Sequence, residues 1–285
     1  MKRSQKYTIQ LIQLMHVQIR WYYNTRALVV SQSMKYRKEK TMKLNRKINY
    51  LKLDRVEDHK LINDQKIRYY KCPINLDSDE FELLPSVTSI LSVTLPKNNV
   101  NEWISRIGKE NAELIKNEST LLGSMVHKII EQKIKGENLD IEKEENNVDK
   151  ILIMQAKSMA NILLEKYVEK MDEITGIEEN LWYPGLYSGT TDIIYIKNGK
   201  LFLGDFKTSK SIKRDKDILQ YKLQLIAYSV AHEEVYNEKI KGMEIMMINR
   251  SLNDQYWYLD RFSIEYFSLY DKWIKLLDEF YNLNI

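Results

Sequence analysis

The stretch DIIYIKNGKLFLGDFK, residues 192–207, has two runs of β-branched, aliphatic and aromatic residues on either side of Asn198-Gly199. Asn-Gly favours a two-residue type I′ turn, because both central positions of that turn need a positive φ angle. The stretch therefore predicts a β-hairpin in which the numbers of paired residues sum to 397. In that register Asp192 lies opposite Asp205, at the end of the hairpin away from the turn.

Two opposed carboxylates repel each other unless something compensates their charge. Ile194 and Leu203 share their face of the predicted hairpin, so an unpaired charge there would be costly. Carboxylate oxygens suit Mg²⁺ or Mn²⁺, and Lys207 projects from the same face as Asp205. Exposed acids with a surface ion-pair partner would fit the hairpin too, and a bulge at Gly204 would shift the register.

Residues 119–131 have helical periodicity and predict a helix that begins at a Ser119 or Thr120 cap. His127 and Glu131 are four residues apart, which places them on one helical face. The pair fits a carboxylate that orients a metal-binding imidazole. A single His on a helix is more often structural, so this motif is weak by itself.

A second helical pattern follows the hairpin and extends to about residue 235. It aligns three polar side chains on an otherwise apolar helix, namely Gln220, Gln224 and Tyr228. If the helix packs behind the hairpin, this row faces the carboxylates and could bond metal ligands or nucleic-acid backbone; otherwise it faces solvent.

Together these motifs resemble the PD-(D/E)XK nuclease superfamily in its RecB-like branch. That branch has a helical Gly-x-x-x-His, a strand Asp, an Asp/Glu-x-Lys and a Gln-x-x-x-Tyr helix. The sequence contains all four in this order, as Gly123 to His127, Asp192, Asp205 to Lys207, and Gln224 to Tyr228. Residues 83–282 also resemble the single-strand exonucleases typified by the mitochondrial genome maintenance exonuclease, and their phage relatives more closely.

The resemblance implies a fold of the α/β (α+β) class, with a mixed central sheet flanked by helices and a helical subdomain before it. It implies that Asp192, Asp205 and Lys207 are catalytic. It also implies a Mg²⁺ or Mn²⁺ site formed by His127, Asp192, Asp205 and the backbone carbonyl of Phe206. Lys207 would hold or activate the attacking water, as a base or as an electrostatic clamp.

Further residues are expected to support the ligands or to contact DNA: Glu131, Gln220, Gln224, Tyr228, Thr208, Ser209, Lys210, Lys213, Arg214, Ser86 and Thr88. A solvated basic loop explains the residues after Lys207 about as well, and helix capping explains Ser86 and Thr88 equally well.

The expected function is a metal-dependent DNA exonuclease that acts as a monomer on single-stranded ends in replication, recombination, repair or genome processing, alongside replication or recombination proteins. An endonuclease or double-strand exonuclease is the alternative within the enzyme class. A catalytically silent nucleic-acid-binding scaffold is the alternative outside it.

A single cysteine, Cys72, leaves no partner for an intramolecular disulfide and too few ligands for a four-cysteine iron–sulfur cluster. This usage suits a reducing compartment, and no apolar run approaches the length of a membrane span. We therefore expect a cytoplasmic protein, in the host cytoplasm if the gene belongs to a phage, with the mitochondrial matrix as the alternative.

Residues 1–53 contain 13 of the 44 Lys and Arg residues but one of the 40 acids, which leaves 31 basic against 39 acidic residues in the rest of the chain. DNA binding by the predicted nuclease domain, residues 54–285, must therefore depend on a local basic strip and the metal. The basic extension fits a mitochondrial targeting sequence, a disordered DNA-binding arm, or an upstream addition to a true start at Met34 or Met42. The last is favoured.

Periodicity places the remaining elements in the order helices first, then a sheet with helices. The helices are predicted at 98–117, 147–173 and 263–282, with a short one entered from an extended segment at 81–91, and the strands at 177–184, 189–197, 200–207, 243–249 and 255–262. Trp103 and Trp273 lie on apolar helical faces and are predicted to be core, or else platforms for base stacking.

Overall fold

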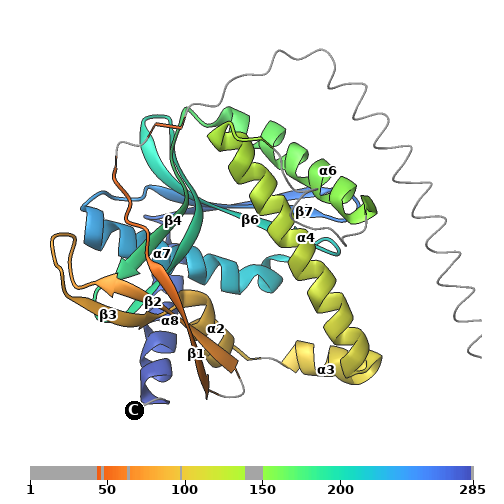
Figure 1. Cartoon of the computed structure of the whole chain (residues 1–285), viewed down its shortest axis with the longest axis horizontal. Coiled ribbons are helices and arrows are strands. Elements are labelled where there is room, and N and C mark those ends of the chain that lie inside the picture. The colour runs from red at the N-terminus through yellow and green to blue at the C-terminus, as the bar shows by residue number, and fades with distance from the viewer. Residues whose placement is uncertain (1–43, 46–47, 63–64, 97, 139–149, 284–285) are drawn as a thin grey trace, which may run out of the picture. The chain divides into compact units, whose positions relative to one another are not determined.

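The computed structural model describes residues 44–45, 48–62, 65–96, 98–138 and 150–283 (Figure 1). Its main sheet has the strand order β4-β5-β6-β7-β8. Strands β6 and β7 are parallel and the other neighbours are antiparallel, so the sheet is mixed, as predicted. The strands are β4 (Glu173–Tyr183), β5 (Tyr187–Lys197), β6 (Lys200–Ser209), β7 (Gly242–Asn249) and β8 (Asp254–Asp260).

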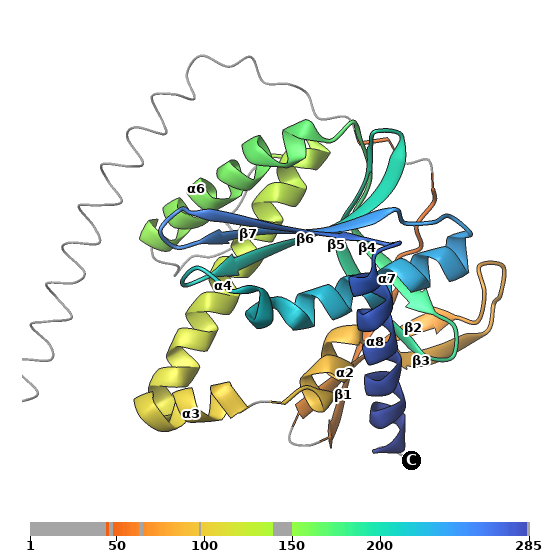
Figure 2. The ribbon, with the colours of Figure 1, turned by 180° about the vertical axis from the view of Figure 1, so that it is seen from behind.

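Helices cover both faces of this sheet (Figures 1 and 2). Phe202 and Phe206 point into a core with α4 and α6, whereas Leu203 points into a second core with α2, α7 and α8. Successive strand residues alternate between faces, so a strand covered on both sides is mostly apolar; all of β7 is buried, including Glu244 and Asn249. The described α-helices are α2 (Val87–Thr94), α3 (Asn98–Ile107), α4 (Lys109–Lys135), α6 (Lys150–Lys166), α7 (Leu219–Tyr236) and α8 (Ile264–Asn282).

The predicted hairpin register is confirmed from the turn as far as Ile193↔Gly204. Asn198 and Gly199 have φ angles of 52° and 69°, and the ladder runs from Lys197↔Lys200 to Ile193↔Gly204. A Cβ atom at Gly204 would lie 2.6 Å from side-chain atoms of both Ile193 and Met246. Gly204 therefore serves close packing within the regular ladder, rather than the bulge considered above.

The predicted division of the first helices is wrong. Gly108, with φ 85°, ends α3 at Ile107, and α4 then continues without a break from Lys109 to Lys135. Ser119 and Thr120 thus lie inside α4 and do not cap a helix. Only glycine adopts this backbone conformation readily, so the boundary between the two helices is at Gly108. The helix then continues through the polar Ser119-Thr120 pair.

A small antiparallel sheet precedes α2; its third strand is the extended segment predicted before the short helix, but its first two strands were not predicted. It consists of β1 (Asp54–Ile62), β2 (Gln65–Pro73) and β3 (Phe81–Pro85), in the order β1-β2-β3. Charged residues interrupt the period-two hydrophobic pattern of the first two strands, and this conceals them. Other predictions hold with shifted ends: β4 begins at Glu173, and α6 ends at Lys166 before a short 3₁₀ turn, Val168–Lys170.

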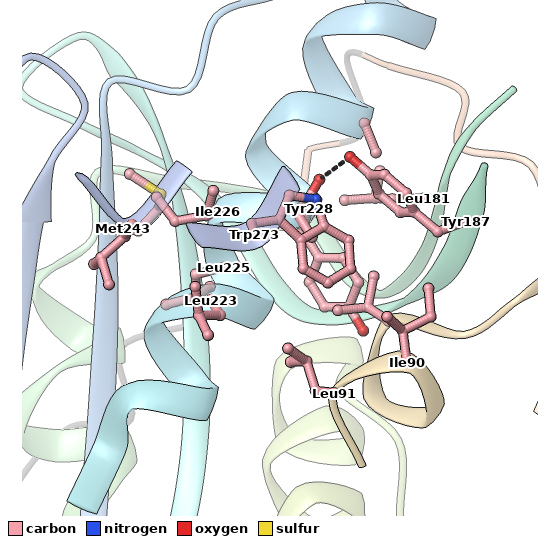
Figure 3. Close-up of a cluster of buried hydrophobic side chains, with 14 of the residues drawn as sticks. Ile90, Leu91, Leu181, Tyr187, Leu223, Leu225, Ile226, Tyr228, Met243 and Trp273 are labelled. Atoms are coloured by element: carbon pink, nitrogen blue, oxygen red, sulfur yellow. Dashed lines mark hydrogen bonds between the residues drawn. The ribbon is translucent and has the colours of Figure 1, made fainter. Parts of the chain in front are cut away.

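Trp273 of α8 is fully buried, as predicted, and packs edge-on against Tyr187 with ring centroids 5.1 Å apart (Figure 3). The Tyr187 hydroxyl donates a hydrogen bond to the carbonyl of Ala227 in α7 (3.1 Å), which ties β5 to that helix. Trp103 of α3 is only partly buried. No described helix combines the length and the hydropathy of a membrane span.

The described end of the basic N-terminal segment, residues 48–53, packs on the nuclease domain; we call it the strap. Tyr50 is buried and its hydroxyl lies 3.0 Å from Nε2 of His232 in α7. The Leu53 amide donates to Oδ1 of Asn180 in β4 (2.9 Å). The predictions of an extension, a targeting sequence or a later start concern mainly residues 1–43, which lie outside the described residues.

We expect His232 to make stability depend on pH. Its Nδ1 lies 3.0 Å from the Glu238 carbonyl and so carries the proton, which leaves Nε2 to accept from Tyr50. Burial lowers the pKa of His232 to about 4. The neutral imidazole therefore stabilises the fold fully above the unfolded pKa of about 6.5, and this contribution is lost as the pH falls towards 4.

Urea unfolding of the wild type and His232→Gln should measure this loss. Relative to the variant, the wild type should lose about 2 kcal/mol between roughly pH 7.5 and pH 5. A stability difference between the two proteins that does not change with pH would contradict the assignment.

Candidate active site

The main sheet splits at one point, and the acidic residues lie there. The β5–β6 ladder ends at Ile193↔Gly204, beyond which β5 continues beside β4, and β6 continues beside β7. Asp192 and Asp205 are the next residues of the two strands, and they do not form a ladder pair as the register predicted. Instead, the Phe206 amide donates to Oδ2 of Asp192 (2.6 Å). The Asp192 carboxylate thus replaces a backbone acceptor where the strands separate.

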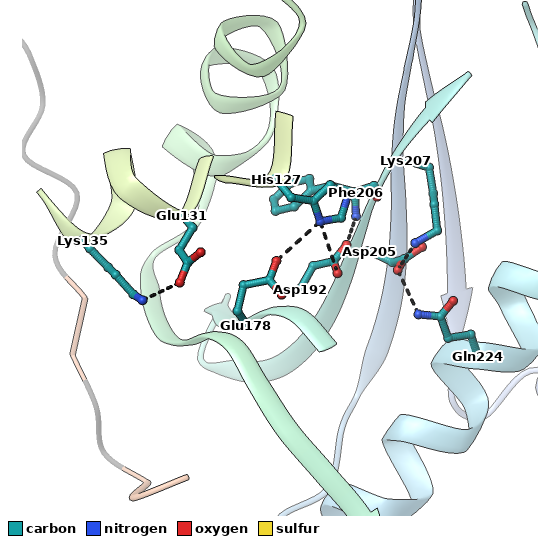
Figure 4. A network of polar contacts seen from close by, with 9 residues as sticks. All are labelled: His127, Glu131, Lys135, Glu178, Asp192, Asp205, Phe206, Lys207 and Gln224. Atoms are coloured by element: carbon teal, nitrogen blue, oxygen red, sulfur yellow. Dashed lines mark hydrogen bonds and ion pairs between the residues drawn. The ribbon is translucent and has the colours of Figure 1, made fainter. Parts of the chain in front are cut away.

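His127 of α4 faces this split from the helical layer (Figure 4). Its Nε2 lies 2.9 Å from the carbonyl oxygen of Phe206, and its Nδ1 lies 3.6 Å from Oδ1 of Asp192. Nδ1 also lies 3.4 Å from Oε1 of Glu178 in β4. One possible ligand atom each from His127, Glu178 and Asp192 lies within 4.8 Å of the others. The three side chains are thus close enough to share one ion.

Asp205 lies on the other side of the split, next to α7. Its Oδ1 accepts hydrogen bonds from Nζ of Lys207 (2.5 Å) and Nε2 of Gln224 (3.4 Å). Its side chain is 2 % exposed, and Oδ2 has no hydrogen-bond partner among the described residues. Lys207 also lies 5.2 Å from the ring centre of Tyr221, which limits the directions its ammonium can take.

Burial and neighbouring charges shift the pKa values of this group strongly. Burial raises the pKa of Asp205; Lys207 opposes the shift, and Asp192 adds to it. Burial alone would lower the pKa of His127, but Asp192 and Glu178 outweigh it and raise the pKa to about 9. Burial would likewise lower the pKa of Lys207, yet Asp205 and Asp192 raise it above its usual value. The site is therefore rich in negative charge and attracts cations.

The donor set fits a hard divalent cation. Carboxylate oxygens, one imidazole and a backbone carbonyl are ligands that Mg²⁺ and Mn²⁺ accept. The unpartnered Oδ2 of Asp205 is a buried acceptor that a cation would satisfy, and such an atom is costly to leave alone. The residues present thus fit the metal implied by the motifs.

Glu178 belongs to this group and was missed by the sequence analysis. The β4–β5 ladder pairs Ile177 with Ile193 and Glu179 with Thr191, so Glu178 falls opposite Asp192. The Tyr183-Pro184-Gly185 turn could have indicated this register, because paired residue numbers across it sum to 370. The two adjacent glutamates left open which one points to the site.

Glu131, which was predicted to orient the His127 imidazole, has a different partner in the structure. Glu131 lies beside the site, in a shallow hollow shared with Gly123, Ser124, His127, Lys128 and Glu178, but its carboxylate accepts from Lys135 (2.5 Å). The structure does not bring Glu131 to the imidazole, whose contacts are with Glu178, Asp192 and Phe206 (Figure 4).

The three polar residues predicted to line one face of α7 have different surroundings. Gln224 reaches Asp205, while Gln220 is exposed in the first turn. Tyr228 is buried against β5, where a Cβ at Gly189 would lie 2.5 Å from its hydroxyl oxygen. Only glycine leaves room for Tyr228 at this position.

The residues after Lys207 form the end of β6 and an exposed loop. Thr208 lies against α4, because its Oγ1 would be 3.3 Å from a Cβ at Gly123. The Ser209 hydroxyl donates to the Ser211 carbonyl (2.8 Å), Lys210 is exposed, and Lys213 bonds Gln255 through its backbone.

Ser86 and Thr88 lie at the start of α2. Ser86 is buried and caps this helix by accepting from the Ser89 amide (3.1 Å), so the capping alternative accounts for it. Thr88 is exposed, and its hydroxyl lies 3.2 Å from that of Ser86.

Comparison with known proteins gives a family match and two weak structural likenesses. The family model of the PD-(D/E)XK nuclease superfamily matches residues 104–272. One solved structure, an exonuclease by provisional assignment from Eubacterium rectale, has 14% identity and a TM-score of 0.40 over 57% of this chain and 68% of its own. The structure of SSO0001 has 14% identity and a TM-score of 0.37 over 70% of this chain and 75% of its own. No curated protein matches the sequence.

The family match covers more than half of the chain and includes the α4, β5, β6 and α7 residues described above. It agrees with the mixed sheet and its two helical layers. This chain belongs to the PD-(D/E)XK nuclease superfamily, and it is a nuclease whose substrate is nucleic acid.

Proposed function

We propose that this nuclease is a divalent-metal-dependent DNA exonuclease that hydrolyses phosphodiester bonds at the ends of single-stranded DNA. One observation carries the proposal. Where β5 and β6 separate, His127, Asp192 and the Phe206 carbonyl meet on one side of the split. Asp205 lies on the other side, and Lys207 bonds its carboxylate. This arrangement combines oxygen and nitrogen ligands for a metal ion with an ammonium group, that of Lys207, for the phosphate.

Nucleases of this superfamily use divalent metal ions, and we assign the ion here to Mg²⁺ or Mn²⁺. His127, Asp192, Asp205 and the Phe206 carbonyl would hold it. When bound, such an ion neutralises charge on the phosphate and supplies a nucleophile near neutral pH.

The protein's own residues would then orient the scissile phosphate. Lys207 carries its ammonium at the buried edge of the site and would donate to a phosphate oxygen on which negative charge grows. Gln224 holds the Asp205 carboxylate from α7, and the Phe206 amide holds that of Asp192. Both acids are thereby positioned before substrate arrives, which is how a site lowers its reorganisation cost.

The DNA backbone would follow the loop after β6. Lys210, Arg214 and Lys216 are exposed there. The chain beyond residue 53 is acidic overall, so a local strip of this kind must supply the attraction to phosphates.

The helical arm formed by α3 and the first half of α4 supports the choice of single strands. Figure 2 shows α3 at the end of α4 away from the main sheet, while the second half of α4 carries His127 to the site. We infer that this arm lets a single strand approach and hinders a duplex. Leu114, which is 63% exposed, and the partly buried Trp103 offer apolar surfaces for bases.

A silent scaffold has no need of this site. A buried Asp205 whose Oδ2 has no hydrogen-bond partner among the described residues costs stability, and a scaffold without metal would gain nothing in return. An exonuclease of this kind would serve replication, recombination or repair together with proteins of those processes.

The substrate class can be tested with end-labelled linear single-stranded DNA, linear duplex, circular single-stranded DNA and RNA, each with Mg²⁺ or EDTA. We expect Mg²⁺-dependent loss of the linear single strand and no cutting of circles. Cutting of circles would make the protein an endonuclease, and preference for the duplex would contradict the role given to the arm. Binding without cleavage of any substrate would favour the silent scaffold.

Asp205→Asn should reduce cleavage by about a hundredfold or more, because it removes a charged ligand of the proposed metal ion. The replacement keeps the side-chain volume, so the circular dichroism spectrum and much of the DNA binding should be retained. Asp79→Asn, at an exposed loop position, is the matched control and should cleave like the wild type. Wild-type turnover by Asp205→Asn would refute the site.

A further inference from the structure

We propose that Lys52, in the strap, is a positioning residue that presents the Glu178 carboxylate to the metal as a ligand beside His127 and Asp192. The inference rests on the proposed metal-dependent function. It concerns a residue outside the family match, which begins at residue 104.

Glu178 has an unusual backbone conformation. Its φ angle is 49°, in the left-handed region that residues other than glycine seldom adopt. It stands between two regular ladder pairs of β4 and β5, and no ladder pair forms at Glu178 itself. Such a conformation persists only where the surroundings hold it, and it is a common device at functional sites.

The local geometry separates two adjacent acids. The Glu178 side chain is 29% exposed and faces His127, whereas Glu179 is 1% exposed. Neighbouring side chains point to opposite faces in a regular strand as well. Here the left-handed backbone of Glu178 sets the direction of its side chain. Glu178 thereby reaches the hollow lined by Gly123, Ser124 and Lys128.

Lys52 holds the peptide that joins these two acids. Its Nζ donates to the Glu178 carbonyl (2.8 Å) and lies 3.0 Å from Oε2 of Glu179. The direction of the Glu178 carbonyl depends on the ψ angle of Glu178. The hydrogen bond from Lys52 therefore restrains the backbone conformation in which the Glu178 side chain faces His127. The hydrogen bond to the peptide oxygen has a charged donor, and the ion pair with the buried Glu179 carboxylate adds to it.

The strap places Lys52 through its neighbours in sequence. Tyr50 contacts His232, and the Leu53 amide bonds Asn180, two residues beyond Glu178. The Leu51 amide also donates to the Tyr236 hydroxyl (3.4 Å). Lys52 is thus anchored on both sides, although its side chain is 58% exposed.

Glu178 in turn completes a ligand group. Its Oε1 lies 3.4 Å from Nδ1 of His127, and the ligand atoms of Glu178, His127 and Asp192 lie within 4.8 Å of one another. A further carboxylate increases the charge and the number of oxygen donors around a hard cation, and both raise its affinity.

Titration calorimetry of Mn²⁺ binding to the full-length protein tests the proposal. Glu178→Gln should weaken Mn²⁺ binding by about tenfold or more, because it removes a charged ligand. Lys52→Met should weaken it by about tenfold, since changes behind a ligand commonly cost about 10- to 100-fold. Lys52→Arg should retain the wild-type affinity, because it keeps a cation with the same partners. The exposed residues Glu165 and Lys66 provide matched controls, and Glu165→Gln and Lys66→Met should bind like the wild type.

Cleavage assays supply a second measurement. In Lys52→Met the Mn²⁺ concentration for half-maximal activity should rise while the rate at saturating Mn²⁺ stays near that of the wild type. A general loss of stability would lower both. If Lys52→Met does not fold, Lys52→Gln takes its place, with folding checked by circular dichroism.

The outcomes separate the inference from the proposed function. Wild-type Mn²⁺ affinity in folded Glu178→Gln would overturn the ligand role, and the same result for Lys52→Met would overturn the positioning role. In both cases Asp205→Asn would still lose Mn²⁺ and activity. Absence of Mn²⁺ binding by the wild type itself would overturn the proposed function and this inference together.

Discussion

The separation of β5 from β6 after Ile193↔Gly204 is the constraint on which the site depends. Two strands that part leave backbone donors and acceptors unpaired, and buried groups of this kind must find other partners. The Asp192 carboxylate accepts from the Phe206 amide, and the Phe206 carbonyl is left to meet His127. The same event that interrupts the sheet therefore places a carboxylate, a carbonyl and an imidazole around one point.

The two helical layers act on that point from opposite sides. The α4 layer brings His127, and the α7 layer brings Gln224 to Asp205. Alternation along β6 directs Phe206 into the first layer while Asp205 and Lys207 face the second. Close contacts at Gly123 and Gly189 let both helices approach the strands. The position of each functional group is thus a consequence of core packing, which is stiff on the scale of a methyl group.

The site holds several negative charges in a largely buried position. Glu178 and Asp192 flank His127, and Asp205 pairs with Lys207. Hydrophobic burial elsewhere in the sheet supports this unfavourable cluster, and the raised pKa values of Asp205, His127 and Lys207 reflect it. The strap extends the support to β4, because Lys52 bonds the backbone of Glu178 and the side chain of Glu179.

The sequence by itself determined the hairpin and its register as far as Ile193↔Gly204, since Asn198-Gly199 and the alternation of apolar residues are local signals. The mixed sheet was expected from the resemblance to the nuclease superfamily. The sequence also indicated Asp192, Asp205, Lys207, His127 and Gln224, whose spacing follows the periods of strand and helix. Glu178, the unbroken α4, the sheet β1-β2-β3 and the strap were decided only by the tertiary structure. Each of them depends on contacts between segments far apart in the chain, such as Lys52 with Glu178, and a local pattern carries no information about such contacts.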